Sequence, residues 1–225
     1  MPYSAPVNAP INAPINAPIN ASIKILIVDD HPLVRDGLRT RLEGIPHFSV
    51  VAEAGTAEEA LEHAANRQID LVLMDINLKG MSGIELTGCF NERYPEIAVL
   101  VLSMHDKGEY VMKAIQAGAR GYVLKDSPAA DIITAIDTVM NGGIYYSAGL
   151  ATHLSRPLSP AMLLTPREKE VLARIAGGKS NKLIARELDL SVRTVETHRW
   201  NIKRKLGIEG QAELIRFALE QSIGI

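Results

Sequence analysis

Short apolar runs of this sequence end at residues whose side chains could do chemistry. Two runs end at carboxylates, one at a hydroxyl and one at an amine. In chain order these residues are Asp29 and Asp30, Asp75, Ser103 and Lys125. Three carboxylates brought together repel one another, so such a site needs a hard cation, and we expect Mg²⁺ held by carboxylates, a carbonyl and waters. The cation would neutralise charge on an incoming phosphoryl group and leave one carboxylate as nucleophile, while the lysine and the hydroxyl contact phosphoryl oxygens.

These residues meet only if the runs are strands of one sheet. From Ile23 onward, strand-sized apolar runs alternate with segments of helical periodicity. The predicted strands are 24–28, 49–52, 71–74, 98–102 and 121–124, and the predicted helices are 32–43, 56–66, 84–93, 107–117 and 128–140. This alternation predicts an α/β fold, a doubly wound domain around a five-stranded parallel sheet. Ligands of such sheets bind beyond the carboxyl ends of the strands, where these residues would gather.

Each residue taken alone has a plainer interpretation. An Asp at a strand end is commonly a turn residue or a helix cap, and a lone Lys there is usually solvated. The ordered set at successive strand ends is much harder to explain in that way.

Residues 23–140 resemble the receiver domain of bacterial two-component response regulators, which has a flavodoxin-like fold. The matching segments are 25–32 (ILIVDDHP), 71–75 (LVLMD), 101–103 (VLS) and 121–125 (GYVLK). The resemblance implies that Asp75 accepts a phosphoryl group from a sensor histidine kinase. It also implies roles for neighbouring residues: Mg²⁺ ligation by Asp29 or Asp30 with Asp75 and the backbone carbonyl of Asn77, phosphoryl contacts by Ser103 and Lys125, and a rotating switch aromatic at Tyr122.

One position departs from the receiver pattern. Receivers usually carry proline four residues after the phosphorylated Asp, and Lys79 occupies that place here. Gly80 still allows the loop to turn. We expect phosphorylation to be retained, with a change in loop stiffness and in the charge near the metal.

A helical segment, 163–225, follows a linker, 141–162, that is rich in Gly, Ser and Pro. Thr165 and Glu168 form a capping-box pattern around a first helix that begins at Pro166. Helices at 182–188 and 192–206 are joined by a short turn, and a fourth spans about 211–221. Two helices joined by a tight turn, the second long and basic, predict a DNA-binding helix-turn-helix.

Helical spacing assigns the two sides of the third helix. The positions expected to point inward are Val192, Val195, Ile202 and Leu206, and those expected on the opposite side are Arg193, Glu196, Thr197, Trp200, Lys203 and Arg204. The excess of basic residues between 193 and 205 suits phosphate contact. Glu196 could accept a hydrogen bond from cytosine, and Thr197 could meet a thymine methyl group. Trp200 has two alternative interpretations: it packs against the receiver or the fourth helix, or it contacts DNA.

Residues 163–220 resemble the LuxR-type helix-turn-helix that ends the NarL/FixJ class of response regulators. The matching segments are 164–168, 180–185, 190–198 and 205–207. The resemblance implies that the third helix enters the major groove and that the fourth forms a dimer contact. The phosphate contacts it suggests are Thr194, His198, Arg199 and Lys203. A homodimer, formed on phosphorylation, would read paired half-sites in promoter DNA, and RNA polymerase is left open as a further partner.

Charge and composition agree with this organisation. Residues 161–225 carry twelve Lys and Arg against eight Asp and Glu, whereas residues 1–160 carry twelve against eighteen. A proline at every fourth position of 7–18 predicts a disordered low-complexity leader over 1–22. The single cysteine, Cys89, excludes an internal disulfide framework. The apolar runs are too short to span a bilayer and no signal peptide is evident, so we expect a cytoplasmic protein that does not engage a membrane.

The predicted function is transcriptional control by a two-component phosphorelay, not catalysis. In the mechanism we expect, the unphosphorylated receiver covers the recognition face, and phosphorylation releases it. The enzymatic alternative is a phosphatase with an aspartyl-phosphate intermediate, but Asn77 stands where its second carboxylate is needed. A receiver that works without phosphorylation is a third alternative, and the complete acidic site argues against it.

Overall fold

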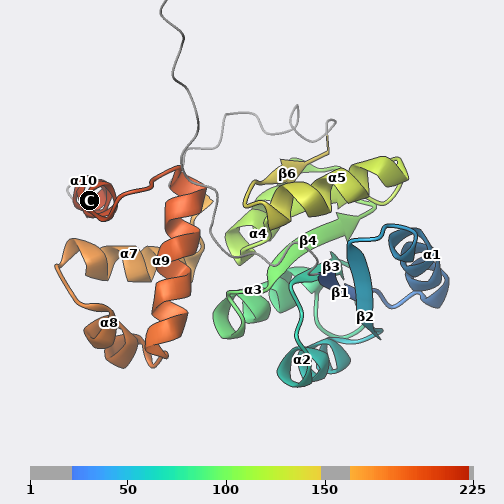
Figure 1. Ribbon diagram of the computed structural model, residues 1–225, viewed down its shortest axis with the longest axis horizontal. Coiled ribbons are helices and arrows are strands. Elements are labelled where there is room, and N and C mark those ends of the chain that lie inside the picture. The colour runs from blue at the N-terminus through green and yellow to red at the C-terminus, as the bar shows by residue number, and fades with distance from the viewer. Residues whose placement is uncertain (1–21, 148–162, 223–225) are drawn as a thin grey trace, which may run out of the picture.

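A computed structural model describes residues 22–147 and 163–222, which form an α/β domain and a helical domain (Figure 1). Residues 1–21 of the predicted leader and 148–162 of the predicted linker lie outside the described residues. Within the described ranges, no helix is both long enough and apolar enough to cross a membrane.

Six parallel strands form one sheet in the order β2-β1-β3-β4-β5-β6. They are β1 (Ile23–Val28), β2 (Phe48–Ala54), β3 (Leu71–Asp75), β4 (Ala98–Ser103), β5 (Gly121–Leu124) and β6 (Tyr145–Tyr146). The predicted parallel sheet is confirmed, but the expected number of five strands is wrong. The sixth strand was assigned to the linker because a two-residue strand has no periodicity to detect.

Five helices cover the two faces of the sheet. They are α1 (Pro32–Glu43), α2 (Ala57–Asn66), α3 (Gly83–Arg93), α4 (Gly108–Ala117) and α5 (Ala129–Met140). Within β1, Leu26 and Val28 pack toward α2, α3 and α4, while Ile25 and Ile27 pack toward α1 and α5. This alternation follows from the period of two in a strand, and burial on both faces explains why the central strands β3 and β4 are apolar up to their last residues.

The start of α3 lies unusually close to the end of β3. Ser82 caps the helix in a capping box with Glu85, and the Gly83 N–H donates to the carbonyl oxygen of Ile76 at 2.9 Å. A Cβ added to Gly83 would lie 1.8 Å from the backbone carbonyl oxygen of Asp75. Only glycine therefore allows this packing, which fixes the backbone of Asp75 at the edge of the sheet.

The helical domain contains the four predicted helices: α7 (Pro166–Ala176), α8 (Asn181–Leu188), α9 (Val192–Leu206) and α10 (Gln211–Ser222). The predicted capping box of Thr165 and Glu168 is confirmed. Asp189, in the left-handed conformation with φ of 53°, ends α8, and Ser191 caps α9. The tight turn between α8 and α9 is thus made by one left-handed residue followed by a helix cap.

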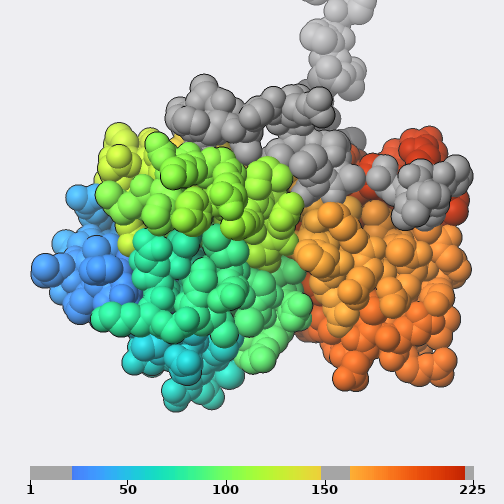
Figure 2. Space-filling model, turned by 180° about the vertical axis from the view of Figure 1, so that it is seen from behind, coloured from blue at the N-terminus to red at the C-terminus, as the bar shows by residue number. Residues whose placement is uncertain are grey.

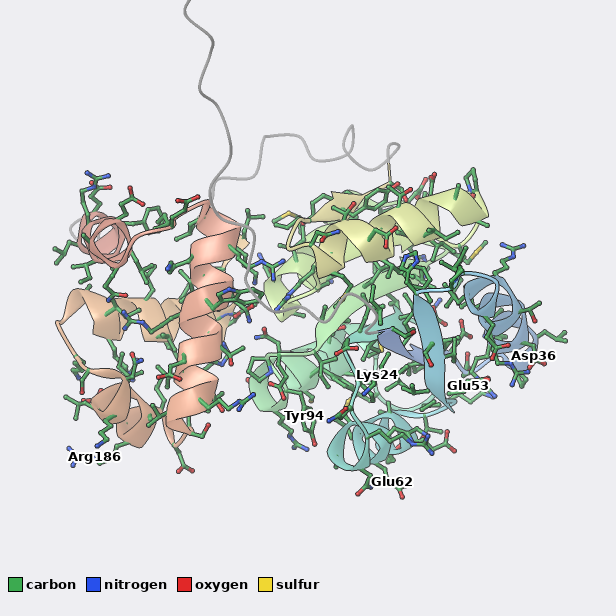
Figure 3. All side chains as sticks on the ribbon, viewed as in Figure 1. Lys24, Asp36, Glu53, Glu62, Tyr94 and Arg186 are labelled. Atoms are coloured by element: carbon green, nitrogen blue, oxygen red, sulfur yellow. The ribbon has the colours of Figure 1, made fainter. Side chains whose placement is uncertain are left out.

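The two domains touch along α9, which lies on the side of the helical domain that faces the receiver (Figure 1). Figure 2 shows the two domains side by side from behind. Figure 3 shows Arg186 of α8 and Asp36 of α1 at opposite ends of the molecule. Helix α1 is therefore remote from the contact between the domains.

Candidate functional site

Three carboxylates gather at the carboxyl ends of β1 and β3, as the sequence predicted. Asp29 and Asp75 are only 2% and 3% exposed. One ligand atom from each of Asp29, Asp30, His31 and Asp75 lies within 4.8 Å of the others. The parallel sheet creates this cluster because it brings the ends of neighbouring strands to one edge.

Lys125 joins the cluster from the end of β5. Its Nζ lies 2.6 Å from Oδ2 of Asp29 and 3.0 Å from Oδ1 of Asp75. Its backbone N–H donates to the carbonyl oxygen of Ser103 at 2.8 Å, which fixes the residue beside β4. One ammonium group thus bridges two buried carboxylates and compensates only part of their charge.

The remaining charge suits a divalent cation with oxygen ligands. Oδ1 of Asp30 is buried and accepts no hydrogen bond from the described residues, although His31 Nδ1 lies 2.7 Å away. Carboxylate oxygens in this number and proximity are the donors that Mg²⁺ prefers. The chain therefore has an acidic pocket typical of a Mg²⁺ site, and its donor set fits that ion.

The electrostatics of Asp75 reflect its burial. Removal from water raises the pKa of the Asp75 carboxyl, the hydrogen bond and charge of Lys125 lower it, and the nearby Asp29 carboxylate raises it. The net direction is upward, so the folded protein disfavours the ionised form of Asp75. A bound cation beside the carboxylate would favour that form again.

Ser103 and Tyr122 meet through a residue that the sequence reasoning missed, His105. Ser103 Oγ accepts a hydrogen bond from the His105 backbone N–H at 3.0 Å, and the Tyr122 hydroxyl donates to the His105 carbonyl oxygen at 2.7 Å. The His105 ring stacks on Tyr110, with centroids 4.4 Å apart, and its Nε2 lies 3.3 Å from Nδ2 of Asn77. The position of His105, two residues after Ser103 and just beyond the end of a buried strand, could have marked it as a site residue in the sequence.

Tyr122 lies inward in this structure, with its side chain completely buried beside the β4–α4 loop. Burial raises the pKa of its phenol above the ordinary value. The hydroxyl therefore stays protonated and available as a donor near neutral pH.

The predicted DNA-contacting residues of α9 fall into three groups by the exposure of their side chains. The exposed side chains are Arg193, Glu196 and Trp200, the partly buried ones are Thr194, Thr197, Arg199, Lys203 and Arg204, and the buried one is His198. The exposed members near the start of the helix are placed where a recognition helix meets base edges. Their contact with DNA stays a prediction.

The prediction that His198 contacts phosphate is wrong for this conformation. The side chain is fully buried, and neither ring nitrogen has a hydrogen-bond partner among the described residues. Burial lowers the pKa of His198, so the imidazole is held neutral. The reason is helical spacing, because His198 follows Val195 by three residues and precedes Ile202 by four, on the inward stripe. Val192, expected to point inward, is instead exposed in the first turn.

One basic residue of α9 is internal. Lys205 Nζ lies 2.7 Å from Oε2 of Glu168, whose side chain is fully buried, and the Lys205 side chain is only 9% exposed. The same Glu168 oxygen accepts the backbone N–H of Thr165 in the capping box. Lys205 therefore anchors α9 to the start of α7, and the charge available to DNA is smaller than the sequence count suggested.

Family comparisons agree with both parts of this geometry. Residues 25–137 match the model of the response regulator receiver domain, and residues 162–218 match that of the LuxR family of bacterial regulatory proteins. The chain belongs to the response regulator family. It is a two-component, DNA-binding transcriptional regulator of the NarL/FixJ class and not an enzyme, so the phosphatase alternative is excluded.

Relatives of this response regulator match it over most of their length. The transcriptional regulatory protein MctR of Rhizobium johnstonii is 44% identical over 203 residues, covering 89% of this chain and 95% of the relative. The oxygen regulatory protein NreC of Staphylococcus epidermidis is 35% identical over 215 residues, covering 89% and 99%. A LuxR-family response regulator from Aurantimonas sp. SI85-9A1 is a similar solved structure, with a TM-score of 0.58, 36% identity, and coverage of 60% of this chain and 96% of that chain. A structure of the response regulator RcsB in complex with DNA has a TM-score of 0.57, 25% identity, and coverage of 87% and 97%.

The receiver of this response regulator holds α9 through a buried amide. Asn201 is almost completely buried, its Nδ2 donates to the carbonyl oxygen of Pro95 at 3.1 Å, and its Oδ1 accepts from Nη2 of Arg120 at 2.7 Å. Burial, followed by the charge of Arg204, lowers the pKa of Arg120 to about 10, so the guanidinium remains charged at neutral pH. Asn201 was not predicted from the sequence, although its position beside Ile202, on the inward side of the helix, could have identified it.

Trp200 and Arg204, both predicted to contact DNA, also lie at the contact between the two domains. The Arg204 guanidinium lies 4.0 Å from the ring centroid of Trp200, and its Nη2 donates to the carbonyl oxygen of Val139 at 3.5 Å. Arg120 lies 5.9 Å from the same Trp200 ring. The expectation that the receiver covers the recognition face is therefore wrong as stated, because it contacts the C-terminal half of α9 and leaves Arg193 exposed.

Proposed function

We propose that this response regulator is phosphorylated on Asp75 by a sensor histidine kinase and that phosphorylation controls its binding to promoter DNA. The observation that supports the proposal best is the position of Asp75, buried beside Asp29 and bridged to it by Lys125. A carboxylate held next to a fixed ammonium and a cation pocket is suited to nucleophilic attack on a phosphorus atom.

In the proposed reaction, a carboxylate oxygen of Asp75 attacks the phosphorus of a phosphohistidine. The new bond is an acyl phosphate, and the phosphorus–nitrogen bond breaks as the kinase imidazole leaves. Asp29, Asp30 and the Asn77 carbonyl would hold Mg²⁺ with Asp75, and that ion would neutralise phosphoryl charge. Lys125 supplies a second, permanent positive charge at the phosphoryl oxygens. The Ser103 hydroxyl, which accepts from the His105 backbone N–H, donates its own hydrogen bond to a phosphoryl oxygen.

We propose further that the regulator binds paired half-sites as a homodimer. Ile215 and Leu219 of α10 are exposed apolar side chains four residues apart, which places them on one face of that helix. The related RcsB has been solved in complex with DNA, which supports DNA as the partner of α9 here. The receiver predicted over 23–140 extends through β6 to Tyr146, because β6 pairs with β5 in the same sheet, so the predicted linker of 141–162 begins later than expected. We propose that 163–225 is the DNA-binding domain and that the protein is cytoplasmic.

We propose that phosphorylation acts on DNA binding through the contact between the two domains. This contact engages Asn201 and Arg204 of α9 through hydrogen bonds and places Arg120 beside the half-exposed Trp200, while Arg193 and Glu196 in the N-terminal part of the same helix stay exposed. A further hydrogen bond joins Nδ2 of Asn91 in α3 to Oγ1 of Thr165 at the start of α7. Phosphorylation would favour the undocked state by shifting Ser103 and Tyr122, which lie between Asp75 and the β4–α4 loop.

Phosphate incorporation from a small acyl phosphate tests the chemical part of this proposal. With acetyl phosphate and Mg²⁺ we expect one phosphoryl group per chain by intact mass spectrometry. An excess of EDTA is expected to abolish incorporation, because the three carboxylates then repel the donor. Equal incorporation with and without chelator would overturn the assigned role of the acidic pocket.

A further inference from the structure

Lys79 brings a second ammonium group to the acidic pocket from outside the buried cluster. Its Nζ lies 3.9 Å from Oδ2 of Asp30, whose side chain is only 11% exposed. Lys79 itself is 83% exposed, so its charge stands at the mouth of the pocket and not within it. Lys125, by contrast, contacts Asp29 and Asp75 from inside.

The loop between β3 and α3 places Lys79 there. Gly80 turns the chain with φ of +89°, and Ser82 then starts α3. The loop forms one side of an open groove beside the carboxylates, which Asp30, Lys79 and Lys113 all line. Lys113 differs from Lys79 in one respect that matters: its Nζ lies 2.6 Å from a carboxylate oxygen of Glu109 on its own helix.

We propose that the positive charge of Lys79 weakens divalent-cation binding at the acidic pocket. This inference rests on the proposed function, since it assumes that the pocket holds Mg²⁺. The ammonium already neutralises part of the charge on Asp30, so an incoming cation gains less attraction. It also repels that cation directly. Both effects raise the dissociation constant of the cation, and solvent exposure limits them to a small factor.

The consequence for the regulator is a pocket that loads only at higher Mg²⁺ concentration. Phosphorylation depends on the loaded pocket, so the rate would follow the free Mg²⁺ level over a higher range than it would without Lys79. The basis is electrostatic, and it therefore weakens with added salt, because the lysine charge is exposed and screened while Asp29 and Asp75 are buried.

Magnesium affinities of full-length variants test this inference. The Kd is measured by titrating MgCl2 while following ¹⁵N amide shifts near Asp29 and Asp75. At low ionic strength, Lys79→Met is expected to lower the Kd for Mg²⁺ by about threefold to tenfold. Lys79→Arg, which keeps the charge, and Lys113→Met, which removes a lysine from the same groove, are expected to stay within about twofold of the wild type.

The salt dependence of the Kd distinguishes an effect of the Lys79 charge from an effect of the substitution on the loop conformation. The difference between Lys79→Met and the wild type is expected to shrink when ionic strength rises from about 0.01 to 1 M, where the screening length falls to about 3 Å. The inference would be overturned if Lys79→Met and Lys113→Met bound Mg²⁺ with equal affinity, or if Lys79→Arg also lowered the Kd for Mg²⁺. It would also be overturned if the difference in Kd between Lys79→Met and the wild type did not change with salt. Absence of Mg²⁺ binding in both the wild type and Lys79→Met would overturn the proposed function itself.

Discussion

Asp75→Asn is expected to reduce phosphate incorporation from an acyl phosphate to the background level. The amide keeps the shape of the carboxyl group, but it cannot form the acyl phosphate. Asp29 and Asp30 remain in place, so loss of incorporation would identify the nucleophile and not merely the pocket. Intact mass spectrometry of the full chain, with acetyl phosphate and Mg²⁺, measures the result.

The same variant is expected to remain folded, with a higher melting temperature than the wild type in the absence of Mg²⁺ at pH 7. Burial raises the pKa of Asp75, so its ionised form destabilises the native state at neutral pH, and the neutral amide removes that penalty. Asp126→Asn is the matched control, since Asp126 follows Lys125 directly and is exposed. Full incorporation into Asp75→Asn, or its loss in Asp126→Asn, would contradict the assignment.

Arg120→Met is expected to increase the affinity of the unphosphorylated protein for DNA. Arg120 belongs to the receiver, so this change leaves every residue of the DNA-binding domain intact. It removes the donor to Oδ1 of Asn201 and the cation beside Trp200. A hydrogen bond from a charged group contributes about 1.5–3 kcal/mol, so the docking equilibrium should move by about tenfold or more, and DNA affinity should follow toward its activated value.

Fluorescence anisotropy with labelled promoter DNA measures this change. Arg41→Met is the matched control, because it removes an exposed arginine from the last turn of α1, away from the domain contact. It is expected to bind DNA as the wild type does. An unchanged or lower affinity in Arg120→Met would show that the docked arrangement does not oppose DNA binding.

The receiver could be predicted closely because its local and global signals agree. Its central strands β3 and β4 are buried, and they are apolar up to their last residues, Asp75 and Ser103, so their ends are sharp in the sequence. Helix caps such as Thr56 and Thr165 were visible as residue types at fixed spacing. The acidic pocket followed from the parallel topology alone, since that topology brings the strand ends together.

The inner contacts of α9 could not be predicted in the same way. Lys205 is buried because Glu168 lies opposite, and Asn201 is buried because Pro95 and Arg120 cover it. These partners come from sequence positions 37, 106 and 81 residues away. Helical periodicity marks which face such a residue occupies, but it does not reveal what packs there, so a basic or polar residue is assigned to the solvent by default.

The central claim is that a phosphoryl group at Asp75 controls DNA binding, and one measurement tests it most directly. The affinity of the full-length wild type for promoter DNA is compared with and without beryllofluoride, a phosphoryl mimic, at constant Mg²⁺ and salt. The predicted result is tighter binding by about tenfold or more with beryllofluoride, as expected if the mimic shifts the docking equilibrium by at least 1.4 kcal/mol. Equal affinity in the two conditions, with the mimic demonstrably bound, would contradict the account.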